Sequence, residues 1–248
     1  MEKAITVSSG RLDADIDLNG GTISCIKFEG KDILFPFGKY LVGDIYKNRG
    51  GIPFLFPNAG KAVEDNSKGL NLKQHGFARD MLWGLLEKNP STFILALKDT
   101  TETFEVYPYH FDIKMIIEVL ENTFSQTVIV KNNSENEMPV ALGFHPYFYV
   151  PIEEKPGFEF KIKDFESTEY IENQKETEFT LKGIAKIKME TSENLKTLAI
   201  WSEPNRPHIC LEPWVGPEYA IIDDANCVKI KPGGSEQFML KLVITPVN

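Results

Sequence analysis

The stretch Leu12-Asp13-Ala14-Asp15-Ile16-Asp17-Leu18 alternates an apolar with an acidic residue at every step. Successive side chains of a β-strand point to opposite faces of a sheet, so this alternation predicts a strand with one buried and one solvated face. The same period of two returns at residues 158–163, where Phe, Phe and Ile alternate with Glu, Lys and Lys, and at residues 238–244. Its recurrence at distant places indicates a β-rich chain.

Further segments have the composition of strands and are bounded by turn residues. The strand candidates are Phe93–Leu97, Phe111–Leu120, Thr123–Val130, Pro139–Phe144, Thr180–Met189 and Leu198–Trp201. Turn signals separate them at short intervals, among them Asn19-Gly20-Gly21, Glu29-Gly30-Lys31 and Lys231-Pro232-Gly233-Gly234. Because no long amphipathic helix stands out, the sequence predicts an all-β, mainly antiparallel sandwich or barrel.

We expect a single domain over residues 1–248, because the chain has no internal repeat and no low-complexity linker. The segment Pro57–Gln74 departs from the pattern of short connections, since it is polar and shows neither the helical nor the strand period. Long structureless loops inside a compact domain are more often functional than idle. We therefore expect this segment to form a rim or lid over a site.

Charge and hydropathy exclude several classes of partner. The 248 residues carry a formal net charge of −9, whereas nucleic acids and anionic membranes require a basic face. No apolar run approaches the ~20 residues of a membrane helix, and residues 1–7 lack the apolar core of a signal peptide. Cys25, Cys210 and Cys227 lack the close spacing of metal or redox motifs, which favours reduced, structural thiols and a cytoplasmic protein. A small anionic ligand remains compatible with this charge.

Three segments rich in aromatic residues contain the side chains best suited to acid-base chemistry. They read Gln-His-Gly-Phe-Ala-Arg-Asp around His75, Gly-Phe-His-Pro-Tyr-Phe around His145 and Cys-Leu-Glu-Pro-Trp around Glu212. Two imidazoles and one carboxylate in such surroundings suggest one site assembled by folding.

His145 and Glu212 are the stronger candidates of the three. His145 follows an apolar strand and is ringed by aromatic residues, an environment that can bury an imidazole and shift its pKa. Glu212 stands between a leucine and a proline, so it has either a specific partner such as Arg206 or a raised pKa suited to a general base. His75 alone is more typical of a structural hydrogen bond than of a catalytic residue.

Other residues admit a structural and a binding interpretation. His110 and His208 lie in plain strands and are interpreted as structural. Arg49 precedes Gly50-Gly51, which is typical of a stiff connection but also lets the backbone approach a ligand whose hydroxyl, carboxylate or phosphate an arginine can grip. Aromatic residues such as Phe54, Phe77 and Trp214 fit a core, although one of them can instead present its face to a sugar ring.

These motifs in this order closely resemble the aldose 1-epimerase (galactose mutarotase-like) family. The blocks are Arg-Gly-Gly-Ile-Pro leading into Leu-Phe-Pro, then His-Gly-Phe-Ala-Arg, then Gly-Phe-His-Pro-Tyr-Phe, then Leu-Glu-Pro-Trp. The resemblance spans nearly the whole chain, and four blocks in register are specific where one would be weak. It implies a large antiparallel β-sandwich, the galactose mutarotase-like supersandwich, with a sugar cleft across one sheet.

The resemblance also implies a role for each residue. Glu212 matches the family's general base at the anomeric hydroxyl, His145 its general acid at the ring oxygen and His75 its second histidine. No metal or organic cofactor is implied. Arg49 and Arg79 resemble the arginines of the hexose-6-phosphate branch, so we expect them, with Phe77 and Trp214, to bind a sugar or sugar phosphate. The acidic residue that binds sugar hydroxyls in galactose mutarotases has no counterpart that these motifs identify.

Two alternatives from other classes stay open. A cupin-like metalloenzyme would also place two histidines and a glutamate in a β fold, since that trio can form a facial triad; however, His75 and His145 lack the close spacing on one strand that such sites usually show. A carbohydrate-binding or sensing protein that kept the cleft but lost turnover is the second alternative. Oligomeric state does not follow from the sequence.

Overall fold

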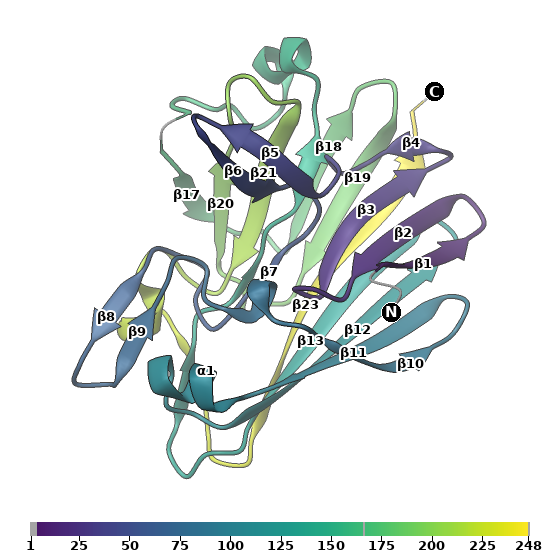
Figure 1. Ribbon diagram of the computed structural model, residues 1–248. Coiled ribbons are helices and arrows are strands. Elements are labelled where there is room, and N and C mark those ends of the chain that lie inside the picture. Colours follow the sequence, from purple (N-terminus) through teal and green to yellow (C-terminus); the bar gives the residue numbers. More distant parts are fainter. Residues whose placement is uncertain (1–3, 166, 248) are drawn as a thin grey trace.

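The computed structural model describes residues 4–165 and 167–247, and β-strands dominate it (Figure 1). Strands account for 54% of residues and helices for 7%, and the ladders between the strands are antiparallel. The predicted all-β antiparallel fold is confirmed.

One layer is a seven-stranded sheet, drawn behind the others in Figure 1. Its strand order is β10 (Gly84–Lys88), β11 (Thr92–Lys98), β12 (Phe111–Leu120), β13 (Thr123–Asn132), β23 (Ser235–Pro246), β19 (Ala185–Thr191) and β18 (Glu176–Leu181). Every second residue of β12 is buried, and Ile113 and Met115 lie opposite Val130 and Val128 of β13. The period of two in the sequence therefore becomes one apolar face of this sheet.

The site is built on a second, six-stranded sheet. It contains β17 (Glu169–Glu172), β20 (Thr197–Trp201), β21 (His208–Trp214), β15 (Gly143–Phe144) and β7 (Phe54–Leu55), with β16 (Tyr147–Tyr149) also paired to β21. All seven residues of β21 are buried. A strand covered on both faces carries a continuous apolar run, so a charged residue within it is buried as well.

A third sheet and several short pairs complete the fold. The third sheet contains β1 (Ala4–Ser9), β2 (Leu12–Asp17), β3 (Thr22–Phe28) and β4 (Lys31–Asp32). The pairs are β5 (Gly38–Val42) with β6 (Ile45–Arg49), β8 (Val63–Asp65) with β9 (Leu70–Leu72), and β14 (Met138–Val140) with β22 (Val228–Ile230). The helices are α1 (Thr101–Val106) and the 3-10 turns Ala78–Asp80, Ile152–Gly157 and Ala220–Ile222. None of the helices in the described ranges is long and apolar enough to cross a bilayer.

The layers share one apolar cluster, which draws buried residues from β1 at one end of the chain to β23 at the other. Phe148 of β16 packs edge-on against Phe179 of β18, with ring centroids 4.7 Å apart, and so joins the six-stranded to the seven-stranded sheet. Isolated bridges between Ile23 and Ile52 and between Leu34 and Phe148 join the sheet of β1–β4 to the segments that carry the site. The cleft described below therefore rests on a packed core rather than on mobile loops.

Four details of the sequence-based assignment are wrong. Residues 158–163 form no strand although Phe158 is buried and its neighbour Glu159 is exposed: side chains alternate, but none of the described strands pairs with this backbone in a ladder. The segment Pro57–Gln74 is not structureless, because it contains the hairpin of β8 and β9. Thr180–Met189 spans a turn between β18 and β19 instead of one strand, and Pro139–Phe144 is interrupted between β14 and β15.

His75 and Gly76 turn the chain sharply at the entrance to the site. Both have positive φ, 65° and 64°, and Phe56 accepts a hydrogen bond from the backbone N–H of Phe77 at 2.9 Å. A Cβ at position 76 would run into the Phe56 carbonyl. Only glycine combines this backbone conformation with so close an approach.

Gly76→Ala should therefore destabilise the protein more than an alanine at an open turn glycine. Gly183, at φ 69° with nothing near the position of its Cβ, is the matched control. Gly183→Ala should lower the free energy of unfolding by about 1 kcal/mol through its φ alone, and Gly76→Ala by roughly 2–3 kcal/mol more, because backbone must move. Chemical denaturation of both variants measures the difference, and equal losses would contradict the close approach at Gly76.

Candidate active site

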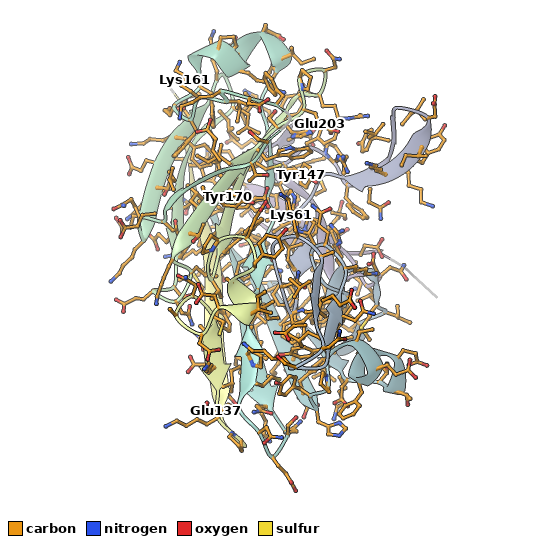
Figure 2. The ribbon with its side chains drawn as sticks, turned by 90° about the vertical axis from the view of Figure 1, so that its left-hand side faces the viewer. Lys61, Glu137, Tyr147, Lys161, Tyr170 and Glu203 are labelled. Carbon is orange, nitrogen blue, oxygen red and sulfur yellow. The ribbon has the colours of Figure 1, made fainter. Side chains whose placement is uncertain are left out.

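A cleft of about 810 Å³ opens over the six-stranded sheet, between β21, the segment before β7 and the hairpin of β5 and β6. That volume fits a small-molecule ligand. Lys61, Tyr147 and Tyr170, which line the cleft, are labelled in the upper half of Figure 2, whereas Glu137 is at the lower end. The polar and aromatic residues that line the cleft include Lys47, Asn48, Arg49, Lys61, Gln74, His75, Arg79, Asp80, His145, Tyr147, Tyr170, Trp201, Glu212, Trp214 and Glu218.

Strand β21 places Glu212 and Trp214 in the cleft. The two residues are separated by one position and so point to the same side of the sheet. Gly143 of β15 lies opposite Trp214 in the ladder, and a Cβ at position 143 would run into the indole ring. The glycine in the Gly-Phe-His-Pro motif thus makes room for the Trp214 ring, two residues before His145.

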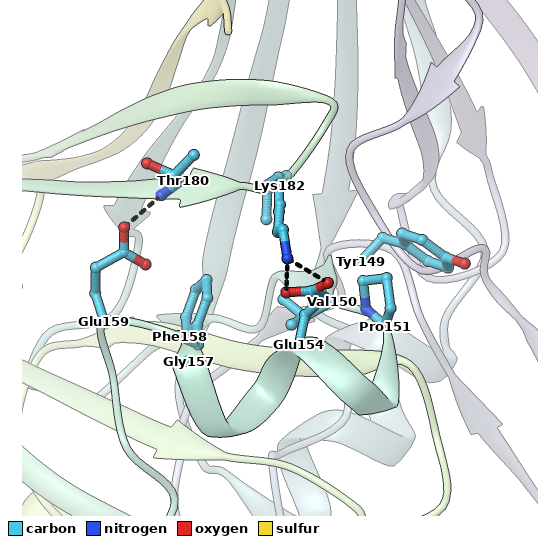
Figure 3. Close-up of a pocket in the computed structure, with 10 residues that line it drawn as sticks. Tyr149, Val150, Pro151, Glu154, Gly157, Phe158, Glu159, Thr180 and Lys182 are labelled. Atoms are coloured by element: carbon cyan, nitrogen blue, oxygen red, sulfur yellow. Dashed lines mark hydrogen bonds and ion pairs between the residues drawn. The ribbon is translucent and has the colours of Figure 1, made fainter.

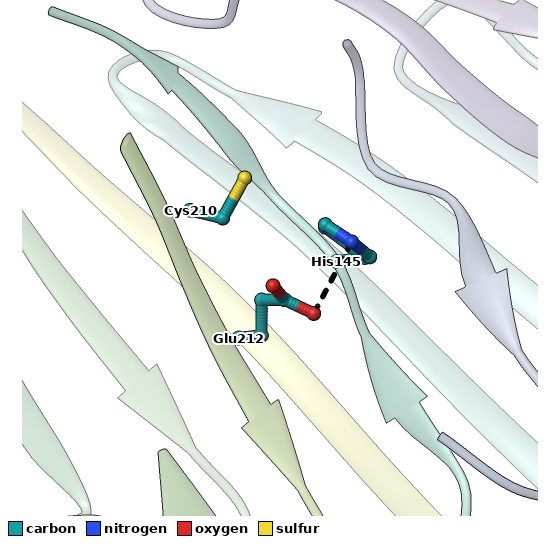
Figure 4. A group of neighbouring side chains, drawn as sticks. All are labelled: His145, Cys210 and Glu212. Carbon is teal, nitrogen blue, oxygen red and sulfur yellow. Dashed lines mark ion pairs between the residues drawn. The ribbon is translucent and has the colours of Figure 1, made fainter. Parts of the chain in front are cut away.

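His145 and Glu212 face one another at the bottom of the cleft (Figure 4). His145 Nε2 lies 3.4 Å from Glu212 Oε2, and only 4% of His145 and 2% of Glu212 are exposed to solvent. The His145 ring stacks on Tyr147 with centroids 4.5 Å apart and planes 4° apart, which fixes its orientation. An acid-base pair is therefore held in a nearly dry environment.

The pair has unused hydrogen-bonding capacity. His145 Nδ1, Glu212 Oε2 and Trp214 Nε1 are buried and have no hydrogen-bond partner among the described residues. The contact between Glu212 and His145 is close enough for an ion pair but is not aligned as a hydrogen bond. Leaving such an atom unsatisfied costs about 1–3 kcal/mol, so three of them in one cleft indicate a place where a polar ligand binds.

His75 reaches the cleft from the turn at Gly76. Its Nδ1 contacts the carbonyl oxygen of Ala59, and the Gln74 side-chain amide approaches its Nε2 at 3.4 Å. The carbonyl can only accept a hydrogen bond, so the neutral imidazole carries its proton on Nδ1 and presents Nε2 as an acceptor. The ring centroids of His75 and His145 are 5.4 Å apart, which places both imidazoles in one site.

Burial shifts the protonation of these groups in opposite directions. Desolvation lowers the pKa of His75 to about 4 and holds the pKa of His145 well below its usual value, with the positive charge of Arg79 acting in the same direction. Desolvation raises the pKa of Glu212 well above its usual value, opposed by Trp214 and Arg79. Each shift disfavours the charged form. Glu212 is thus a stronger base than a surface carboxylate once ionised, and His145 a stronger acid than a surface imidazolium once protonated.

A family profile described as Aldose 1-epimerase matches residues 3–224. The chain belongs to the aldose 1-epimerase family. A relative from Cenchrus ciliaris named "Putative glucose-6-phosphate 1-epimerase" is 27% identical over 272 residues, which cover 96% of this chain and 79% of the relative. The resemblance noted in the sequence is confirmed.

Solved structures agree on the fold of this aldose 1-epimerase family member. The Slr1438 protein from Synechocystis sp. PCC 6803 superposes with a TM-score of 0.85 at 23% identity and covers 98% of this chain and 96% of its own. A galactose mutarotase-like protein from Lactobacillus casei gives a TM-score of 0.80 at 19% identity, with 97% and 99% covered. The chain therefore has the galactose mutarotase-like sandwich.

Arg49 lines the cleft of this protein, but its guanidinium is already paired with Glu203. Its Nε and Nη2 donate to the two carboxylate oxygens of Glu203 at 3.0 and 3.1 Å, and its guanidinium lies over the Trp201 ring. Glu203 also contacts Arg206 at 3.1 Å and His208 at 3.3 Å. Arg206 therefore pairs with Glu203, and the alternative of an Arg206–Glu212 ion pair is wrong.

Arg79, Trp214 and Phe77 differ in how far they reach the cleft. Arg79 lines it and donates to the Gln74 carbonyl at 3.4 Å; among the residues that the structure describes, no carboxylate forms an ion pair with it. Trp214 also lines the cleft, with its ring centroid 6.1 Å from that of His75. Phe77 points the other way, into the core, where it packs on Phe111, and it does not line the cleft.

Several residues of this site were not predicted. Tyr170 donates to Glu218 at 2.8 Å, and Lys61 contacts the same carboxylate at 3.1 Å, so that the three form one polar wall of the cleft. None of them lies in a motif. Lys61 does belong to the Pro57–Gln74 segment that was expected to form a rim over a site, whereas no signal in the sequence distinguishes Tyr170 or Glu218 from surface residues. His208 had been interpreted as structural, and it is fully buried against Glu203, beside the cleft.

A second, smaller cavity of about 200 Å³ lies beside the 3-10 turn Ile152–Gly157 (Figure 3). Its charged side chains already have partners: Lys182 contacts Glu154 at 2.8 Å, and Glu159 accepts the backbone N–H of Thr180 at 2.9 Å. Since the acids and the lysine among its described lining residues all have partners, the larger cleft is the candidate site.

The cluster around Glu203 should make stability sensitive to acid. Burial alone would raise the pKa of Glu203, but hydrogen bonds from His208 and Arg49 outweigh burial and lower the pKa to about 2, from 4.5. A carboxyl with a depressed pKa stabilises the fold above pH 4.5, and this contribution is lost as the pH falls toward 2. We expect the difference in free energy of unfolding between the protein and Glu203→Gln to shrink by roughly 2–3 kcal/mol between pH 6 and pH 2. Urea titrations across that range measure it, and a constant difference would contradict the cluster.

Proposed function

We propose that the protein is an aldose 1-epimerase that interconverts the α and β anomers of an aldohexose or hexose 6-phosphate. The observation that carries the proposal is the buried His145–Glu212 pair, 3.4 Å apart, with unpartnered polar atoms facing a cleft of sugar size. Membership of the aldose 1-epimerase family supports it.

Opening a pyranose requires two proton movements. Glu212 takes the proton of the anomeric hydroxyl while His145 gives a proton to the ring oxygen, so that the bond between the anomeric carbon and the ring oxygen breaks and an aldehyde forms. Rotation about the C1–C2 bond exposes the other face of the aldehyde. As the ring closes, Glu212 returns its proton to the aldehyde oxygen and His145 takes a proton back from the hydroxyl that closes the ring. The proton count of the pair is the same before and after.

The pair can supply both functions with one proton. Because burial disfavours charge on either partner, it favours the neutral pair, in which a single proton rests on Glu212. When it moves to His145, the base and the acid appear together. His75, whose Nε2 is an acceptor, holds a neighbouring sugar hydroxyl in this scheme.

Arg79 is the residue that we propose to decide between free and phosphorylated sugars. Its guanidinium faces the cleft without an ion-pair partner among the described residues, whereas Arg49 is neutralised by Glu203 and serves to shape the wall. An unneutralised guanidinium in a cleft suits a phosphate or another anion. The printed name of the Cenchrus ciliaris relative supports a hexose 6-phosphate.

Arg79→Ala should therefore raise KM for glucose 6-phosphate by about 10–100-fold, the effect of one lost hydrogen bond to a charged group, and leave KM for glucose unchanged. Arg11→Ala removes an exposed arginine that pairs with Glu29 outside the cleft, and serves as the control. If Arg79→Ala leaves catalysis on both glucose and glucose 6-phosphate as it is in the unmodified protein, the phosphate role of Arg79 is excluded.

Exchange between anomers, followed by NMR on equilibrated glucose, galactose and glucose 6-phosphate, tests the proposal. Acceleration of exchange by the protein would support an epimerase and rank its sugars. Binding of a sugar without faster exchange would instead favour a carbohydrate-binding or sensing protein. Activity that tracks a stoichiometric transition metal in elemental analysis would favour the cupin-like alternative.

A further inference from the structure

Cys210 is a buried thiol next to the proposed acid-base pair, and the proposed reaction makes no use of it. It lies two residues before Glu212 on β21, so the two side chains project from the same side of the strand. Its ladder partner on β16 is Tyr147, the residue on which His145 stacks. One ligand atom each from His145, Cys210 and Glu212 lie within 4.8 Å of one another (Figure 4).

We propose that His145, Cys210 and Glu212 form a binding site for a soft divalent cation of the Zn²⁺ and Cd²⁺ class, and that the bound cation excludes the sugar. The sequence-based interpretation gave Cys210 only a structural role, and this proposal adds a role as a metal ligand. The site is inhibitory and supplies no chemistry to the proposed reaction.

The distances suit such an ion. Tetrahedral zinc with bonds of about 2.0 Å to nitrogen and oxygen and about 2.3 Å to sulfur places its ligands roughly 3.5 Å apart. His145 Nε2 and Glu212 Oε2 already lie 3.4 Å apart. The Cys210 sulfur needs to close a gap of roughly 1 Å, which a side-chain rotation supplies.

The unpartnered carboxylate oxygen is a second, independent observation. Among the described residues, Glu212 Oε2 is buried without a hydrogen-bond partner, and a cation would give this carboxylate the partner that it lacks. His145 Nε2, the nitrogen that faces Glu212, has only the Tyr147 hydroxyl as a hydrogen-bond partner among these residues, at 3.5 Å. Both residues line the cleft, so an ion can reach them from solvent, and the fourth position would face the cleft and hold water.

The donor set determines the kind of ion. A thiolate with an imidazole and a carboxylate selects Zn²⁺ or Cd²⁺ over Mg²⁺ or Ca²⁺, which prefer oxygen ligands alone. As the sulfur–metal bond forms, the thiol proton passes to solvent. The inhibitory part rests on the proposed function, because the cation occupies the carboxylate and the imidazole that would move the protons. The binding part does not.

Titration with CdCl₂ tests the site, since a cadmium thiolate absorbs in the ultraviolet. A Cys25→Ser/Cys227→Ser background removes the other two thiols of the chain. We expect one equivalent of Cd²⁺ to produce the band, Cys210→Ser to abolish it, and Glu212→Gln or His145→Asn to weaken Cd²⁺ binding by at least about 10-fold. No band in the folded background protein, or a band that survives Cys210→Ser, would overturn the proposal.

Two further measurements separate the possible failures. If Cys210→Ser does not fold, as circular dichroism would show, the Glu212→Gln and His145→Asn titrations decide, and unchanged Cd²⁺ affinity in both overturns the site. Zn²⁺ should displace Cd²⁺ and, where the protein accelerates anomer exchange, one equivalent should stop it until a chelator or excess sugar is added. A band without any anomer exchange in the metal-free protein would leave the site standing and the proposed function refuted.

Discussion

Replacing Glu212 with glutamine should reduce catalysed anomer exchange by about 10²–10⁴-fold, the contribution of a positioned general base. The amide keeps the shape of the carboxyl but cannot take a proton from the anomeric hydroxyl. Desolvation raises the pKa of Glu212, which means that burial disfavours its negative charge. Removing that charge therefore costs the fold no stabilising interaction. We therefore expect Glu212→Gln to unfold at the same temperature as the unmodified protein or above it. NMR exchange rates and thermal unfolding, measured together, separate lost chemistry from lost fold.

The pH profile gives the Glu212 variant a second signature. Above the raised pKa of Glu212 the pair loses its single proton and has no acid, so activity should fall on the alkaline side and this limb should be absent in Glu212→Gln. Glu193→Gln changes an exposed glutamate that pairs with Lys175 outside the cleft, and should leave both rate and profile unchanged. A full rate in Glu212→Gln would remove this residue from the mechanism.

His145→Asn should lower the rate by about 10²–10³-fold, because it removes the group that we propose as the acid at the ring oxygen. Below the lowered pKa of His145 the pair gains a second proton and has no base, so activity should fall on the acid side; the variant should lack this limb. Asparagine retains a polar side chain against Tyr147, which limits the structural effect. The exchange rate between pH 4 and pH 9 provides the measurement.

Combining the two changes tests whether the residues act as a unit. If Glu212 and His145 share one proton across 3.4 Å, the double variant should be no more than about 10-fold slower than the worse single variant, because either change alone already disables the pair. Multiplied losses would instead indicate two independent groups and contradict the shared proton.

Most strands could be predicted from the sequence because the alternation of apolar and polar residues is a local pattern. Residues 111–120 were predicted as a strand with the bounds of β12, since alternating burial repeats over all ten positions. The hairpin of β8 and β9 was missed because its strands have three residues each, too few to show a period. Residues 158–163 show that alternation reports the burial of side chains, whereas a strand also requires a neighbour with free backbone groups.

The site was predictable where residues occur in motifs. His75, His145, Glu212, Arg49, Arg79 and Trp214 all line one cleft. Phe77 was assigned to the cleft as an aromatic residue that could present its face to a sugar ring, but its side chain points into the core. Glu203, Tyr170 and Glu218 are placed at the site by contacts with residues distant in the sequence. Such contacts leave no local pattern from which they could be predicted.

The carboxylate of Glu203 carries an evolutionary consequence. It neutralises Arg49 from the β5–β6 hairpin and Arg206 from the approach to β21, and it receives His208 as well. Replacing Glu203 with a neutral residue leaves both guanidinium groups without this carboxylate. A single substitution at position 203 therefore costs stability. Positions 49, 203 and 206 should therefore be inherited as a set, and descendants that change their sugar by remodelling the hairpin should show substitutions at all three.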